Sequence, residues 1–154
     1  MPDLHGWITQ QINETERLAS RAAELCGCHP PAPAWSFRDG DEPSDGHILV
    51  VDEPHPGLKR KIGRRWNSSY EGLFMAEHIV RHDPAAVLRR CAADRRILAA
   101  HPYTTTVINP QDGSSNAGFG CETCHAWDAV PEGRGNCSTL LDLAEGYGLT
   151  EEHP

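Results

Sequence analysis

Long apolar runs are what this sequence most clearly lacks. No stretch approaches the 18 or so consecutive apolar residues of a membrane-spanning helix, and the N-terminus lacks the charged-then-apolar layout of a secretory signal. Hydrophobic residues make up only 38% of the 154 residues, whereas glycine (14) and proline (12) are frequent. These features favour a cytoplasmic protein with no membrane partner, a modest core and much irregular structure.

A disulfide framework is also missing, although the chain has six cysteines. A secreted disulfide scaffold is the alternative explanation for that number. Cys26, Cys28 and Cys91, however, occupy helical or near-helical contexts. Reduced thiols in a cytoplasmic protein are therefore the simpler interpretation.

Charge is unevenly distributed along the chain. The net charge is −7 over residues 1–58, +6 over residues 59–96 and −7 over residues 97–154, which together give the overall −8. A basic middle could face nucleic acid or another anionic surface. The acidic flanks could equally neutralise it within the fold.

Helical signals mark both ends of the chain. From Asp3 to Gly27, apolar residues recur at three- and four-residue steps: Leu4, Trp7, Ile8, Ile12, Leu18, Ala19, Ala22 and Leu25. A short helix is predicted over residues 139–145, with Ser138 as its N-cap and glycines after its end. The residues that follow, 149–154, are expected to form a flexible tail.

Two consecutive helices are predicted in the middle. Ser68 and Glu71 form a capping box at the start of the first helix. It ends at Asp83-Pro84, because the residue before proline avoids the helical conformation. Asp83 then caps the second helix, which runs to His101-Pro102. The apolar contacts of the first helix are expected from Leu73, Phe74, Ala76, Ile79 and Val80.

Strand signals are fewer. Residues 47–52 form an apolar, β-branched run bounded by turn residues, and residues 58–66 are a candidate second, basic strand of a small antiparallel hairpin. Residues 35–37 are a candidate short extended piece. Residues 102–120 are rich in threonine, asparagine and glycine, so we predict a mobile loop there.

The most specific chemical pattern is Cys121-Glu-Thr-Cys124, followed after twelve residues by Cys137. A Cys-x-x-Cys turn brings two thiolates within reach of one ion, and Cys137, just ahead of an apolar helical run, adds a third. Soft thiolates select zinc. The sequence therefore predicts a structural Zn²⁺ site; the alternative is that the thiols are unligated or pair transiently.

Three histidines compete with water for the fourth coordination position. His101 ends a predicted helix that could present its imidazole on a fixed scaffold, whereas His125 adjoins Cys124 and His153 lies in the predicted tail. We therefore prefer His101. Three thiolates and a neutral imidazole around Zn²⁺ form a closed shell that stabilises folding and leaves no position for a substrate.

A second candidate site is the histidine–aspartate segment around residue 80. His78 and His82 stand four residues apart on one helix face and could share a metal, with Glu77 or Asp83 as a further ligand or general base. This arrangement would suit a metal-dependent hydrolase. The structural alternative is that Asp83 caps a helix and that the helix dipole favours His82.

Two further segments carry weaker signals. One holds five positive charges and a tryptophan in eight residues: Lys59, Arg60, Lys61, Arg64, Arg65 and Trp66. It could bind along a phosphate backbone, or it could simply be the solvated face of a strand. The other, Cys26-Gly-Cys28-His29, could bind a second metal but has no obvious matching pair of ligands.

Several of these motifs together resemble a known family. The resemblance rests on Glu77–Pro84 with the Val87-Leu88 and Arg95–Leu98 that follow, and on Cys121-x-x-Cys124 with Cys137-x-Thr-Leu. In these motifs, in its N-terminal helix, in a middle hairpin with Trp35 and in Tyr147, the chain is similar to a domain of unknown function common in streptomycetes and found in actinobacterial phages.

The resemblance implies a fold and no activity. Family members typically carry glycine after the second knuckle cysteine and proline or alanine after the third. Here His125 and Ser138 stand at those positions, which makes His125 a better ligand candidate than it would otherwise be.

Taken together, the sequence predicts one α+β domain over residues 1–148, mainly helical, with a small antiparallel hairpin and a zinc knuckle. The preferred function is a zinc-stabilised binding or regulatory module without catalytic activity, whose partner is a protein or a nucleic acid. The alternatives are a nucleic-acid-binding accessory protein that uses residues 59–65 and a metal-dependent hydrolase at the histidine–aspartate segment.

Overall fold

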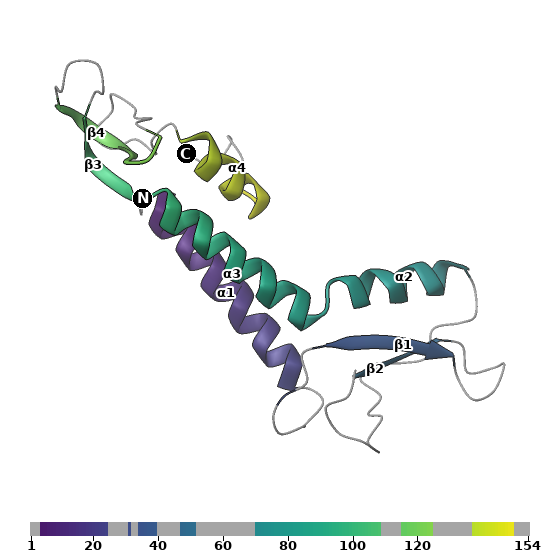
Figure 1. The fold of residues 1–154 in the computed structure, drawn as a ribbon. Coiled ribbons are helices and arrows are strands. Elements are labelled where there is room, and N and C mark those ends of the chain that lie inside the picture. Colours follow the sequence, from purple (N-terminus) through teal and green to yellow (C-terminus); the bar gives the residue numbers. More distant parts are fainter. Residues whose placement is uncertain are drawn as a thin grey trace. The chain divides into compact units, whose positions relative to one another are not determined.

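The computed structural model describes residues 4–24, 31, 34–39, 47–51, 70–108, 115–124 and 137–149. Within these residues the chain forms four helices and two antiparallel sheets of two strands each (Figure 1). Its internal contacts define two compact units, one of Met1–Glu14 with Cys91–Pro154 and one of Thr15–Arg90. The predicted α+β class is confirmed, and the single-domain organisation stays a prediction. None of the described helices combines the length and apolarity that spanning a bilayer requires.

In the first unit, the start of α1 (Leu4–Glu24) lies beside the end of α3 (Pro84–Ala100) (Figure 1). The His5 ring lies against the carbonyl of Leu98, with 3.4 Å between Nε2 and O, and Arg95 donates to the Asn13 amide oxygen at 2.9 Å. These helix segments are therefore antiparallel. Their buried side chains repeat at four- and seven-residue steps, as an apolar helix face requires: Leu4, Ile8, Ile12, Cys91 and Leu98.

A second hairpin follows α3, where the sequence predicted a loop over 102–120. Strands β3 (Tyr103–Ile108) and β4 (Ser115–Cys121) pair antiparallel, with Tyr103 opposite Cys121. The loop prediction is wrong over these strands. The threonine, valine and isoleucine of β3 are good strand formers. The serine, asparagine and glycine of β4 are poor ones, so the sequence carried no signal for the partner strand.

The last helix, α4 (Ser138–Gly146), begins one residue earlier than predicted. Cys137 is its N-cap, with an extended backbone, and its carbonyl accepts the first intrahelical bonds, from Leu140 and Leu141. Ser138 is the first helical residue, so the predicted serine cap is wrong. The Cys137 side chain makes no capping hydrogen bond to α4.

The C-terminal end of α4 is a Schellman motif. Gly148 has φ of 91°, a left-handed conformation that glycine adopts without steric cost. Its N–H donates to Glu145, and the N–H of Leu149 donates back to Ala144. Leu149, predicted to begin the tail, therefore belongs to the helix end; residues 150–154 lie outside the described part of the chain.

In the second unit, β1 (Trp35–Asp39) pairs antiparallel with β2 (His47–Val51), and α2 (Tyr70–Arg81) packs against both strands (Figure 1). The hairpin containing Trp35 that the family resemblance implied is confirmed. The partner of β2 is thus the segment before it; the predicted strand over 58–66 lies outside the described residues.

Two side chains predicted to be buried are exposed. Leu18 of α1 is 54% exposed and Phe74 of α2 is 64% exposed. The neighbouring positions Ala19, Ala23 and Ala76 are the buried ones. Ala19 and Ala76 belong to the predicted apolar faces, so those faces agree with the structure at these positions and Leu18 and Phe74 lie outside them.

Candidate metal centre

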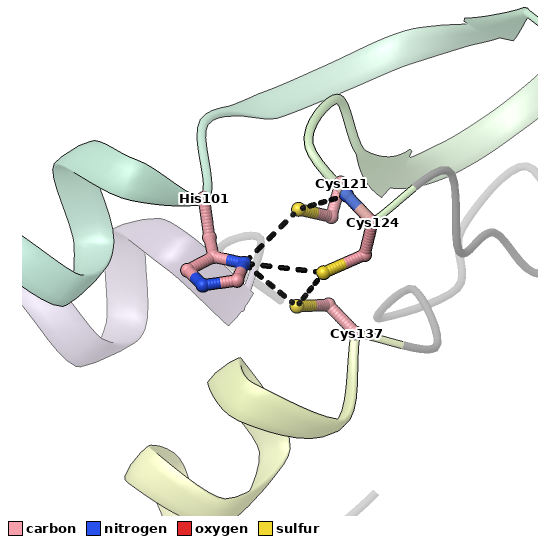
Figure 2. A group of neighbouring side chains, drawn as sticks. All are labelled: His101, Cys121, Cys124 and Cys137. Carbon is pink, nitrogen blue, oxygen red and sulfur yellow. Dashed lines mark hydrogen bonds between the residues drawn. The ribbon is translucent and has the colours of Figure 1, made fainter.

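Four chain segments bring three cysteines and a histidine together within the first unit. His101 follows the last residue of α3, Cys121 ends β4, Cys124 lies in the turn after it, and Cys137 caps α4 (Figure 2). Within the described residues, these four form a group whose candidate ligand atoms all lie within 4.8 Å of one another. These are the residues that the sequence predicted as a Cys3His site.

Four of the six separations between the ligand atoms lie close to those of a tetrahedral zinc site, and the other two, from the Cys121 sulfur to the other sulfurs, are within 4.8 Å. Nδ1 of His101 lies 3.5, 3.2 and 3.6 Å from the sulfurs of Cys121, Cys124 and Cys137, and the Cys124 and Cys137 sulfurs are 3.7 Å apart. Ideal zinc–sulfur and zinc–nitrogen bonds at tetrahedral angles give about 3.6 Å between nitrogen and sulfur and about 3.8 Å between sulfurs. The four residues therefore fit one zinc ion.

Hydrogen bonding alone does not account for this arrangement. An imidazole nitrogen offers either one hydrogen or one lone pair, yet three sulfurs converge on Nδ1 of His101 (Figure 2). At most one of the three contacts can be a proper hydrogen bond. A single cation at the centre would satisfy all four donor atoms at once.

Two of the sulfurs come from buried residues. Cys121 is 0% and Cys137 3% exposed, whereas Cys124 is exposed. Desolvation, followed by hydrogen bonds and like-charge repulsion from the Cys137 and Cys121 sulfurs, raises the pKa of Cys124 from 9.0 to about 11. Because Cys124 is exposed, its sulfur neighbours are the cause with the clearer structural basis. Three thiolates can share this space only if a cation compensates their charge.

The turn that carries Cys124 is held against the end of α3. The Thr123 hydroxyl donates to the Ala100 carbonyl at 2.7 Å, and the Glu122 N–H donates to the Pro102 carbonyl at 3.0 Å. Both bonds join residues next to cysteine ligands to residues next to His101. The sequence analysis did not identify Thr123; its position between the two knuckle cysteines was the available signal.

A backbone amide also supports the cluster. The Cys124 N–H points at the Cys121 sulfur, with 3.4 Å between nitrogen and sulfur (Figure 2). Hydrogen bonds from the surrounding protein orient metal ligands and stabilise the charge of a thiolate. The Cys-x-x-Cys turn therefore contributes a donor as well as two sulfurs.

The other ligand candidates named from the sequence are outside the described residues. His125 and His153 competed with His101 for the fourth position, and Cys26, Cys28 and His29 formed the weaker second cluster. The basic segment Lys59–Trp66 is outside them too. These assignments therefore stay predictions.

At the corner between α2 and α3, Asp83 has a structural role. One carboxylate oxygen accepts the Ala86 N–H at 2.7 Å and thus caps α3, while the other accepts the Trp35 N–H at 3.0 Å. Asp83 is 7% exposed. The N-cap prediction is confirmed. Asp83 thus joins the start of α3 to the start of β1.

His78 and His82 do lie together. Their ring centroids are 4.5 Å apart, and both side chains are exposed, as is that of Glu77. Within the described residues, this pair has no third histidine, cysteine or carboxylate close enough to complete a cluster of the Cys3His kind. The structure thus brings together two of the four residues named for the second site.

The fold and this cluster define a small, mainly helical α+β protein with a candidate Cys3His metal centre. The chain belongs to a family of unknown function, DUF6221, whose model matches residues 1–154. No curated protein and no solved structure matches it significantly. Family membership thus agrees with the resemblance in the sequence and leaves function to be argued from the site.

Proposed function

We infer that the chain is a zinc-stabilised binding or regulatory module whose metal is structural. The observation that carries this inference is the convergence of three sulfurs and one imidazole nitrogen at tetrahedral separations. Catalytic zinc sites keep a coordination position for water or substrate, whereas structural sites use four protein ligands. Here four protein ligands are available, so the metal would have no open position.

The metal would add to the hydrogen bonds that already join the segments that carry its ligands, such as Thr123 to Ala100 and Tyr147 to Asp94. His101, Cys121, Cys124 and Cys137 come from the ends of α3, β4 and α4 and from the turn between them. A chain with 38% hydrophobic residues has a limited core, and structural zinc supplies folding free energy directly. A stabilised scaffold without an open metal position is suited to presenting a surface to a protein or nucleic-acid partner.

The test is metal content per chain, measured by mass spectrometry on untagged protein. We expect one zinc ion per chain in the wild type and none in Cys124→Ser. The first unit, which contains the Cys3His group, should be unfolded in this variant. The matched control is Cys91→Ala, because Cys91 is a buried cysteine outside the cluster and its loss should leave the zinc in place. Wild-type protein that is folded without metal would contradict the proposal.

A nucleic-acid partner has its own structural support. Helix α3 exposes Arg89, Arg90 and Arg96, which add to the positive charge of the predicted basic segment 59–65. Arginines on an exposed helix can neutralise phosphates, and such binding weakens steeply as salt rises. Fluorescence anisotropy with a labelled duplex tests this: binding should fall with salt and with Arg89→Glu/Arg90→Glu. Affinity that is unchanged in both cases excludes a nucleic-acid role for α3.

A further inference from the structure

His78 and His82 form a pair of exposed imidazoles at the end of α2, in the second unit. The His82 N–H donates to the His78 carbonyl at 3.1 Å, so the helical turn continues to His82 and holds both residues on one face. The ring centroids are 4.5 Å apart and the ring planes are tilted by 47°. The contact is therefore not a parallel stack, and both rings are open to solvent.

The distance between the rings distinguishes between coordination geometries. A metal–nitrogen bond of about 2.1 Å, extended to the centre of an imidazole, places the metal about 3.2 Å from each centroid. Two such ligands at right angles then have centroids about 4.6 Å apart, whereas a tetrahedral angle gives about 5.3 Å. The observed 4.5 Å is close to the separation for adjacent positions of an octahedral or tetragonal ion toward which each ring turns one nitrogen.

The surroundings of the pair also favour a cation that keeps water ligands. The end of a helix carries partial negative charge, which attracts a cation. Asp83, the nearest buried carboxylate in sequence, accepts two backbone N–H groups, and among the described residues no third histidine, cysteine or carboxylate forms a cluster with the pair. Two imidazoles therefore supply the protein ligands and solvent fills the other positions.

We propose that His78 and His82 form a second metal site, selective for a divalent ion with octahedral or tetragonal geometry such as Ni²⁺ or Cu²⁺. Imidazole nitrogen suits these ions, and right-angled coordination separates them from tetrahedral zinc. With two protein ligands the site is exchangeable, unlike the Cys3His centre. It does not depend on that centre, because it uses none of its residues.

Binding at this site stabilises the corner between α2 and α3. The last turn of a helix tends to fray, and a ligand that needs both His78 and His82 in helical register binds the folded form only. Such a ligand adds stability that grows with its free concentration relative to Kd. The site therefore links the stability of this corner to the concentration of the ion.

The experiment is calorimetric titration of Ni²⁺ into the full chain with zinc bound, with released zinc followed in the same samples. Ni²⁺ is the probe because Cu²⁺ would attack the thiolates. We expect His82→Ala to weaken the Ni²⁺ site about a hundredfold, since the second ligand acts at high effective concentration. The melting temperature should rise with Ni²⁺ in the wild type and not in the variant.

A second variant controls for the number of histidines. Glu77→His in the His82→Ala background restores two imidazoles, but at adjacent positions that do not face each other on a helix. It should stay as weak as His82→Ala. Both substituted side chains of this design, Glu77 and His82, are exposed, so folding is preserved. Equal Ni²⁺ affinity in the wild type and this double variant, or Ni²⁺ uptake that only displaces zinc, overturns the proposal.

Discussion

Tyr103 lies directly opposite Cys121 in the β3–β4 ladder. Because Tyr103 follows His101 by two residues, this register brings the end of β4 back to the end of α3 and places Cys121 near His101. The hairpin therefore sets the distance between His101 and the Cys-x-x-Cys turn. Tyr103 and the other hairpin residues besides Cys121 thus position the candidate metal centre without belonging to the Cys3His group.

Replacing His101 with alanine should weaken zinc binding without abolishing it. Spreading the roughly 10–16 kcal/mol of a structural zinc site over four ligands gives about 3 kcal/mol per ligand, or about a hundredfold in Kd. Competition with a chromogenic chelator measures this change. His78→Ala, which removes an exposed imidazole outside the cluster, is the control and should bind zinc as the wild type does. Identical affinities for both variants would mean that another group is the fourth ligand.

Zinc affinity should rise with pH. In the metal-free protein the pKa of Cys124 is raised to about 11, so this thiol is protonated at neutral pH and must lose its proton to bind zinc. Each proton released contributes about a tenfold gain in affinity per pH unit. Chelator competition at pH 6, 7 and 8 tests the slope. A flat profile would be incompatible with a thiolate ligand, and Cys91→Ala should keep the wild-type slope.

Substitutions of Asp83 should destabilise the second unit in a graded order. Asp83→Ala removes the cap of α3 and leaves the Trp35 N–H without its acceptor, at a cost of about 2–3 kcal/mol. Asp83→Asn keeps one carbonyl oxygen for a single N–H and should cost less. Chemical denaturation gives the free energies of unfolding. The rate of hydrogen exchange at the Trp35 backbone amide shows whether its hydrogen bond to residue 83 is kept. If Asp83→Ala and Asp83→Asn have the same free energy of unfolding, the hydrogen bond to the Trp35 backbone N–H makes no separate contribution to stability.

Tyr147→Phe should loosen α4 from α3. The Tyr147 hydroxyl donates to the Asp94 carboxylate at 2.6 Å, and Asp94 is 8% exposed. Removing the hydroxyl leaves a buried carboxylate short of a donor, which costs about 1–3 kcal/mol. Zinc content should stay at one per chain, because no ligand changes.

A double-mutant cycle that combines Tyr147→Phe with Asp94→Asn measures the energy of the hydrogen bond between these two residues apart from their other contacts. If Tyr147 and Asp94 act through their mutual bond, the double variant is destabilised by less than the sum of the single variants. Additive effects would instead indicate that each residue is held by other contacts.

Local patterns in the sequence predicted all four helices, although the N-cap of α4 is Cys137 rather than Ser138. Proline at 84 and aspartate at 83 define the junction of α2 and α3 because their effects act within one helical turn. The Cys-x-x-Cys spacing likewise identified Cys121 and Cys124 as a pair, since two ligands in one turn need no distant contact. Cys137 and His101 were also identified, although nothing in the sequence showed that they meet the pair.

Their convergence was decided by the tertiary structure. It depends on the β3–β4 register and on the Thr123 contact with Ala100, which join residues about twenty positions apart. Because the residues of β4 are weak strand formers, the sequence did not predict this strand pairing. It also did not predict that the side chains of Leu18 and Phe74 would be exposed. The sequence by itself determined which residues can bind a metal and where the junction of α2 and α3 lies, because those are local properties. Only the fold determined which of them meet and which faces are buried, because those depend on distant segments packing together.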